Sequence, residues 1–355
     1  MGGLSGLDAA AVIIPSVFLV KALFRNFQSL KEFFSDSFGT VFYIFLFMLF
    51  LGGLSPFSKS YAPYLVRIQE WGKFATGFVF FAVVAVVFND HKRVHHAFVA
   101  IGMTLLIPGA IFYWQLLTGN LVKVSGGLTP SAYFHNPHII AYAANMVLPI
   151  IVFKLSMSSA LIHKIIWSFS VACTLALIYF SYARTAWLAL MIQLVVMLCL
   201  VDNKKIAVFL SVLVFPGFLI LFWGQIAERL YDLVIFFQNI DDAFETTRYD
   251  HLFSGRWFLF RRNLIGFWNS GPISMLFGHG IGGTTYLATG GAHGAGHSSF
   301  ITVLSDFGLV NYIIFLCLIG MLFRKSIKLL RSKNSFFRGM GKVGILTLTA
   351  YLALG

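Results

Sequence analysis

The feature that most constrains this chain is the recurrence of apolar stretches long enough to cross a bilayer. A membrane-spanning helix needs roughly 20 predominantly apolar residues. We identify ten such stretches: Leu4–Val20, Thr40–Leu54, Phe74–Phe88, Phe98–Leu117, His138–Phe153, Ile165–Phe180, Trp187–Val201, Ile206–Trp223, Ser299–Phe323 and one beginning near Gly344. The sequence therefore predicts an all-α, polytopic membrane helix bundle with about 10 or more spans.

Composition excludes the other classes. Only 11% of the 355 residues are charged and 58% are hydrophobic, whereas a soluble domain carries about 25% charged residues. The chain is therefore not a soluble enzyme, a secreted disulfide scaffold or a disordered protein. Its net charge of +13 does not indicate nucleic-acid binding, because Lys and Arg of membrane proteins collect in cytoplasmic loops.

The distribution of basic residues predicts the topology. If the loop after the first span is cytoplasmic, sixteen of the 26 Lys and Arg residues lie in short loops on that side. We expect an N-terminal bundle of about eight spans over 1–223, a large outward-facing loop over 224–298 and C-terminal helices over 299–355. The last stretch, from Gly344, has only about a dozen residues, which predicts a truncated or incomplete helix.

The outward-facing loop has two parts. A helix from Arg256 would place five apolar side chains on one face and Arg262 on the other, as in a helix lying at the headgroup boundary. The five are Trp257, Phe260, Leu264, Phe267 and Trp268. The following stretch, 270–297, is rich in Gly, which predicts a loop able to approach a ligand closely.

Arg184 is the first candidate for chemistry. It follows FSYA at the outer mouth between two spans, and Asp90 is the one acidic residue between Glu70 and Asp202. We expect an unpaired guanidinium there, which would take a lipid phosphate or diphosphate. The alternative is an Arg at a helix end whose charge reaches to the headgroups.

A second candidate is the run SGRWFLFRR. Ser254 and Gly255 indicate a helix start, where backbone N–H groups and Arg256 would together form an anion site. For Arg261 and Arg262 we favour contact with lipid headgroups, with substrate binding by Arg262 as the alternative.

His293 and His297 form the third candidate, in GGAHGAGHSSF. Their spacing suits zinc on a helix, but the intervening Gly-Ala-Gly disfavours a helix and no Glu follows, so zinc is not favoured. Ser298 and Ser299 are natural caps of the next span. His297 then lies at the outer mouth, where a neutral imidazole can act as a general base; the alternative is a solvent-exposed His.

Two further groups complete the set. Asp306 lies within an apolar span, where an acid is a functional or pairing candidate, and we expect it to orient a basic group. His91, His95 and His96 adjoin Lys92 and Arg93; we interpret them as a headgroup-facing run and assign them no role.

These motifs, in this order along the chain, resemble those of the bacterial O-antigen polymerase and ligase superfamily, known as Wzy and WaaL. The resemblance rests on FSYARTAWLAL at Arg184, FSGRW at Arg256, LFGHGIGGT at 276–284 and HSSFITVLSDFGLVN from His297. It covers roughly Ala183–Asn311, and the N-terminal half only as a hydropathy pattern. This chain departs from the family at Ser298, where many relatives have Asn, and in having fewer helices.

The resemblance implies a GT-C-like membrane glycosyltransferase of the bacterial inner membrane, with its site facing the periplasm and with no metal or other cofactor. It implies His297 as the base that takes the acceptor proton, with inversion at the sugar, and Arg184 and Arg256 as the groups that stabilise the leaving diphosphate. Further substrate contacts would come from Arg262, His293 and Ser254, with Asp306 in support.

The implied partners are an undecaprenyl-diphosphate-linked glycan, an acceptor glycan or lipid A-core, and the lipid bilayer, with a chain-length regulator as an additional candidate. Nucleic acid is not among them. We favour a polymerase of O-antigen or exopolysaccharide over a ligase, because the SGRW and LFGHG segments look closer to polymerases. A non-enzymatic transporter of lipid-linked glycans is the more distant alternative, since transporters place their polar residues at mid-depth.

Overall fold

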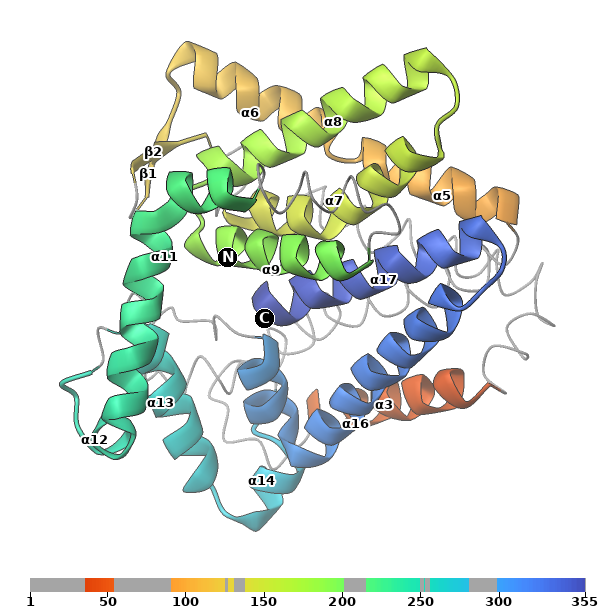
Figure 1. Cartoon of the computed structure of the whole chain (residues 1–355). Coiled ribbons are helices and arrows are strands. Elements are labelled where there is room, and N and C mark those ends of the chain that lie inside the picture. The colour runs from red at the N-terminus through yellow and green to blue at the C-terminus, as the bar shows by residue number, and fades with distance from the viewer. Residues whose placement is uncertain are drawn as a thin grey trace, which may run out of the picture. The chain divides into compact units, whose positions relative to one another are not determined.

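The computed structural model describes residues 36–53, 91–124, 127–130, 138–200, 215–249, 252, 256–280 and 299–354. These residues form helices and one short hairpin (Figure 1). The helices before residue 201 are α3 (Ser37–Gly53), α5 (His91–Met103), α6 (Leu106–Thr118), α7 (His138–Met157), α8 (Leu161–Phe180) and α9 (Arg184–Leu200). The later helices are α11 (Phe215–Gln238), α12 (Ile240–Glu245), α13 (Arg256–Trp268), α14 (Pro272–Phe277), α16 (Ser299–Leu330) and α17 (Ser335–Leu354). Strands β1 (Val122–Val124) and β2 (Gly127–Thr129) pair antiparallel.

The all-α prediction is confirmed, and the membrane character is supported by four helices that are long and apolar enough to cross a bilayer. They cover Lys92–Thr118, His138–Met157, Leu161–Phe180 and Ser299–Leu330, and Ser37–Leu49 and Arg184–Leu200 are shorter apolar helices. The predicted spans Leu4–Val20 and Phe74–Phe88, and the start of Ile206–Trp223, lie outside the described residues.

The predicted span Phe98–Leu117 lies within the membrane-length stretch Lys92–Thr118 and is divided between α5 and α6. The chain turns at Thr104 and Leu105, between α5 and α6. Pro108 is the third residue of α6 and has no N–H to donate to the Thr104 carbonyl, so a continuous helix would lose a hydrogen bond here. The Thr104 hydroxyl Oγ1 donates to the Ile101 carbonyl at 2.6 Å.

The chain divides into two compact units, residues 1–93 with 232–321 and residues 94–231 with 322–355. We call them unit 1 and unit 2. Helices α11 and α16 each run from one unit into the other. The predicted division at residue 223 falls inside α11, so the segment after it begins as a helix.

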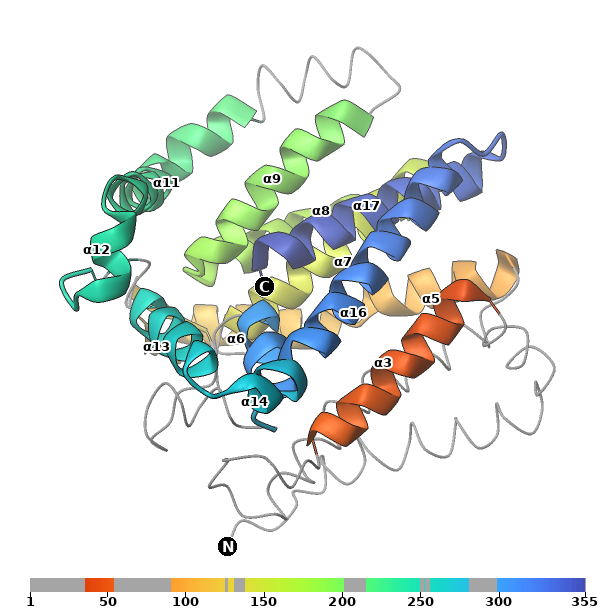
Figure 2. The same cartoon turned by 90° about the horizontal axis from the view of Figure 1, so that it is seen from below.

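In unit 2, α7 packs against α8, α9 and α17 around buried side chains such as Ile140, Leu177 and Trp187 (Figures 1 and 2). Pro149 lies inside α7, so the Asn145 carbonyl has no helical N–H donor. Gln193 Nε2 of α9 donates to that carbonyl at 3.1 Å and to the Leu346 carbonyl of α17 at 3.1 Å. The side chain of Gln193 thus replaces the hydrogen bond that the proline removes and joins three helices.

The last helix is longer than predicted. It begins at Ser335, nine residues before Gly344, and has 20 residues. Asn334 Oδ1 accepts the N–H of Phe336 at 2.9 Å, which is the hydrogen bond of an N-cap. The apolar criterion missed this start because Arg338 and Lys342 lie in the first half of the helix.

In unit 1, α3 packs against α16. The rings of Phe45 and Phe315 are stacked with centroids 6.0 Å apart. Asn311 Nδ2 donates to the Phe307 carbonyl at 2.9 Å and approaches the Met48 carbonyl of α3 at 3.4 Å. This packing fixes the middle of α16, next to the segment that carries Asp306.

Candidate functional site

The start of α13 is anchored by Trp257. Its indole Nε1 donates to the Ala243 carbonyl of α12 at 2.9 Å. Its ring packs edge-on against Phe236 of α11 and Phe244 of α12, at centroid distances of 4.6 and 5.0 Å. The helix begins at Arg256, as the sequence predicts, so this residue directly precedes a fixed aromatic side chain.

The two faces of α13 agree only in part with the amphipathic prediction. Trp257 and Phe267 are buried, and Arg262 is exposed with its guanidinium 4.5 Å from the centroid of the Phe258 ring. Trp268, expected on the apolar face, is 73% exposed. Arg261 is buried, so the expected contact of Arg261 with lipid headgroups is wrong.

A backbone clasp joins the LFGHG and SDFG segments. The N–H of His279 donates to the Ser305 carbonyl at 3.0 Å, and the N–H of Gly280 donates to the Asp306 carbonyl at 2.9 Å. The N-terminal part of α16 and α14 lie side by side in both views (Figures 1 and 2). We refer to residues 278–280 and 305–308 together as the glycine clasp.

The glycine clasp coincides with a break in α16 that the sequence analysis missed. Gly308 has φ 81° and ψ 175°, far from helical values. The carbonyls of Ser305 and Asp306 precede the break, and the helical donors that they would use lie beyond it. The loop N–H groups of His279 and Gly280 supply hydrogen bonds to these two carbonyls. The loop therefore stabilises the break, since a buried carbonyl without a donor is costly.

Three polar side chains are buried at the clasp. Asp306 is 5% exposed, and the side chains of Ser305 and His279 are also buried. The Ser305 hydroxyl has no hydrogen-bond partner among the described residues. The predicted burial of Asp306 is confirmed. His279 and Ser305 were not predicted as site residues, although the two Phe-Gly pairs at 277–278 and 307–308 were a signal, because a Gly that breaks a helix marks a special backbone.

Arg184 belongs to unit 2, where it is the first residue of α9. It follows a tight turn in which Tyr182 has a positive φ of 52° and Ser181 Oγ accepts the N–H of Ala183 at 3.2 Å. The neighbouring Thr185 hydroxyl bonds to Tyr142 of α7 at 3.0 Å. Arg184 is half-buried and has an interaction partner within the chain, so the expectation of an unpaired guanidinium is wrong.

The structure describes only some of the remaining predicted residues. Ser254, His293 and His297 lie outside the described residues, as does the side chain of Arg256. Arg184 is in unit 2, whereas Arg262 and Asp306 are in unit 1. Within the described residues, no group of three or more His, Cys, Asp or Glu side chains could hold a metal ion.

No family model matches the chain, and no curated protein matches it.

Proposed function

We propose that this chain is a metal-independent, inverting glycosyltransferase of the bacterial inner membrane. It would polymerise undecaprenyl-diphosphate-linked oligosaccharide repeat units of O-antigen or exopolysaccharide on the periplasmic side. In this proposal the bundle is GT-C-like, has about 10 or more spans, and carries the segment 224–298 as its periplasmic loop.

The observation that carries the proposal is the glycine clasp. Two of the four segments on which the family resemblance rests, LFGHG and SDFG, are hydrogen-bonded to each other through His279, Gly280, Ser305 and Asp306. This contact joins two segments that are distant in the sequence, which supports the proposal that they are parts of one site. The chain between them, 281–298, contains His297, which lies outside the described residues.

The proposed reaction is a direct displacement at the anomeric carbon. His297 takes the proton of the acceptor hydroxyl while the acceptor oxygen forms its bond to the anomeric carbon. The bond from that carbon to the diphosphate oxygen breaks, and undecaprenyl diphosphate leaves with the bonding electron pair. Arg184 and Arg256 stabilise the charge that develops on the diphosphate, with Arg262, His293 and Ser254 as further substrate contacts. Asp306 would act as a supporting group.

Two alternative functions predict different outcomes. A ligase would transfer the glycan to lipid A-core instead of to another repeat unit. A transporter of lipid-linked glycans would move the donor without breaking a bond, and the broken helix α16 favours this alternative, because discontinuous membrane helices are typical of transporters.

The experiment is a turnover assay with the purified chain in proteoliposomes that contain an undecaprenyl-diphosphate-linked repeat unit. We expect products of two or more repeat units together with released undecaprenyl diphosphate. Products that require added lipid A-core would favour the ligase, and donor that crosses the bilayer unchanged would favour the transporter. Arg248→Ala, which changes an exposed Arg of the same segment, is the matched control for Arg256→Ala.

A further inference from the structure

Unit 2 contains a buried cation that the proposed reaction does not use. Lys154 of α7 is 5% exposed. Its Nζ lies 2.9 Å from Nε2 of His95, which is exposed, and 5.9 Å from the centroid of the Trp167 ring. Neither neighbour is an acid, and the described part of unit 2 has no Asp and a single Glu, Glu228 on α11. A buried ammonium group whose described neighbours include no carboxylate favours binding of an anion.

The same end of unit 2 carries a concentration of basic residues. Phe153, which precedes Lys154, packs on Phe98 of α5 and on Phe336 of α17, with centroids 5.9 and 5.8 Å apart. The chain around Phe336 has seven Lys and Arg residues and no acid: Arg324, Lys325, Lys328, Arg331, Lys333, Arg338 and Lys342. Clusters of four to eight such residues beside a membrane span are typical of sites for anionic lipid headgroups.

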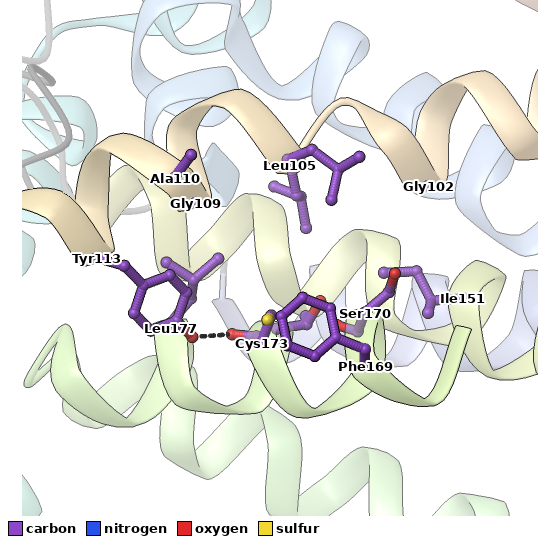
Figure 3. A pocket seen from close by; sticks show the side chains of 12 residues that line it. Gly102, Leu105, Gly109, Ala110, Tyr113, Ile151, Phe169, Ser170, Cys173 and Leu177 are labelled. Atoms are coloured by element: carbon purple, nitrogen blue, oxygen red, sulfur yellow. Dashed lines mark hydrogen bonds between the residues drawn. The ribbon is translucent and has the colours of Figure 1, made fainter. Parts of the chain in front are cut away.

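An apolar cavity of about 380 Å³ lies between α5–α6 and α8 of the same unit (Figure 3). Gly102 and Ile151 are at one end, and Ala110 and Tyr113 are at the other. Gly102 on α5 and Tyr113 on α6 are eleven positions apart in the chain, which at the helical rise corresponds to at most about 16 Å. This length is about half of the ~30 Å hydrocarbon thickness of a bilayer, which is the depth of one leaflet. The cavity therefore has the polarity and the length to take one acyl chain.

The region around Lys154 and His95 adjoins the cavity. Ile151 is one turn before Lys154 on α7, and Gly102 is two turns after His95 on α5. The Trp167 ring lies against Gly102, where an added Cβ would be 3.0 Å from it, and also beside Lys154. An indole at the boundary between a charged region and an apolar one is a common arrangement in membrane proteins.

The geometry points to a binding site for a phospholipid with a net negative headgroup. Its phosphate contacts His95, Lys154 and the basic connection between α16 and α17, and one acyl chain lies in the cavity beyond Trp167. The headgroup supplies the negative charge near Lys154, and the chain fills the space between α6 and α8. This site is separate from the proposed transfer reaction and does not depend on it.

The test measures lipid binding to the purified full chain in detergent by native mass spectrometry and by thermal unfolding. Phosphatidylglycerol should bind and raise the unfolding temperature, whereas phosphatidylcholine with the same acyl chains and inorganic phosphate should not. Lys154→Gln should weaken phosphatidylglycerol binding about tenfold, the size expected for one lost charge-assisted hydrogen bond. His95→Gln changes an exposed residue and should weaken binding without affecting folding, so it decides the question if Lys154→Gln does not fold.

Matched variants separate the two parts of the site. Lys164→Gln removes the same charge from an exposed Lys of α8 and should leave binding unchanged. Gly109→Leu fills the cavity and should weaken binding, whereas Ile107→Phe, on α6 but outside the cavity and 74% exposed, should not. Equal binding of phosphatidylcholine, equal effects of Lys154→Gln and Lys164→Gln, or preference for undecaprenyl phosphate over phosphatidylglycerol would each overturn the assignment.

Discussion

Gly278 and Gly308 have nearly the same backbone conformation, and each occupies the space where a side chain on the other would lie. Their φ and ψ angles are 84° and 176° for Gly278 and 81° and 175° for Gly308. A Cβ on Gly278 would be 2.6 Å from the backbone nitrogen of Gly308, and one on Gly308 would meet the backbone of Leu276 and Gly278. Because these angles are accessible essentially only to glycine, the break in α16 and the conformation of the preceding loop depend on both residues.

Substitution of either glycine should therefore damage the clasp. Gly278→Ala and Gly308→Ala should each destabilise unit 1 by about 3 kcal/mol, since both backbone strain and steric overlap are introduced. Thermal unfolding of the purified protein in detergent measures this effect. Gly320→Ala is the control on the same helix, because a Cβ there meets nothing within 4 Å. Equal unfolding temperatures for Gly308→Ala and Gly320→Ala would contradict the clasp.

The hydrogen bond from Gln193 to the Asn145 carbonyl should matter because Pro149 removes the usual donor. Gln193→Leu should cost about 1 kcal/mol, in the range of interhelical hydrogen bonds in membranes. In a Pro149→Ala background the cost should be smaller, since an alanine has an N–H for the Asn145 carbonyl. A double-mutant cycle on unfolding measures the difference. Additive effects of the two substitutions would show that Gln193 does not replace the missing donor.

Local capping patterns in the sequence predicted two helix starts. Ser254 and Gly255 correctly indicated a helix from Arg256, and Ser298 and Ser299 indicated one from Ser299. Capping preferences act within a few residues, so they are visible in sequence alone. Asn334 was a similar signal for α17 that the hydropathy pattern obscured.

Features that depend on distant contacts were not predictable in this way. Gly308 lies in an apolar stretch that fits a continuous helix, and its break is stabilised by a loop almost thirty residues earlier in the sequence. Likewise, the sequence around His95 does not predict the contact between His95 and Lys154. These two residues meet only because α5 packs against α7. Local patterns indicated several of the helices and the burial of Asp306, while tertiary packing determined the clasp around it.

The two arginines of the proposed site should be essential for transfer. Arg184→Ala and Arg256→Ala should each cost about 2–4 kcal/mol of transition-state stabilisation, as expected for loss of a charge-assisted contact to the diphosphate. Lys should substitute poorly, because it lacks the planar guanidinium fork. Glycan ladders from membranes with matched protein levels measure the effect. Ladders of wild-type length from either Ala variant would rule out its role, and Arg248→Ala should leave the ladder unchanged.

Transfer should not require a divalent cation. The proposed mechanism uses arginines to neutralise the diphosphate, so EDTA should leave turnover of the purified protein unchanged. Turnover is measured before and after chelation, and again after addition of magnesium or manganese. Activity that is lost on chelation and restored by either ion would replace the arginine mechanism with a metal-assisted one.

The central claim is base-catalysed glycosyl transfer, and the most direct measurement compares His297→Ala with His293→Ala in the purified assay with a lipid-diphosphate donor. A general base contributes typically 10²–10⁴-fold, so His297→Ala should lose most turnover while donor binding is retained. His293→Ala should have a milder effect, because it lies outside the four motifs on which the family resemblance rests. An inactive His293→Ala beside an active His297→Ala would assign the base to the other histidine, and full activity of both variants would contradict base-catalysed transfer.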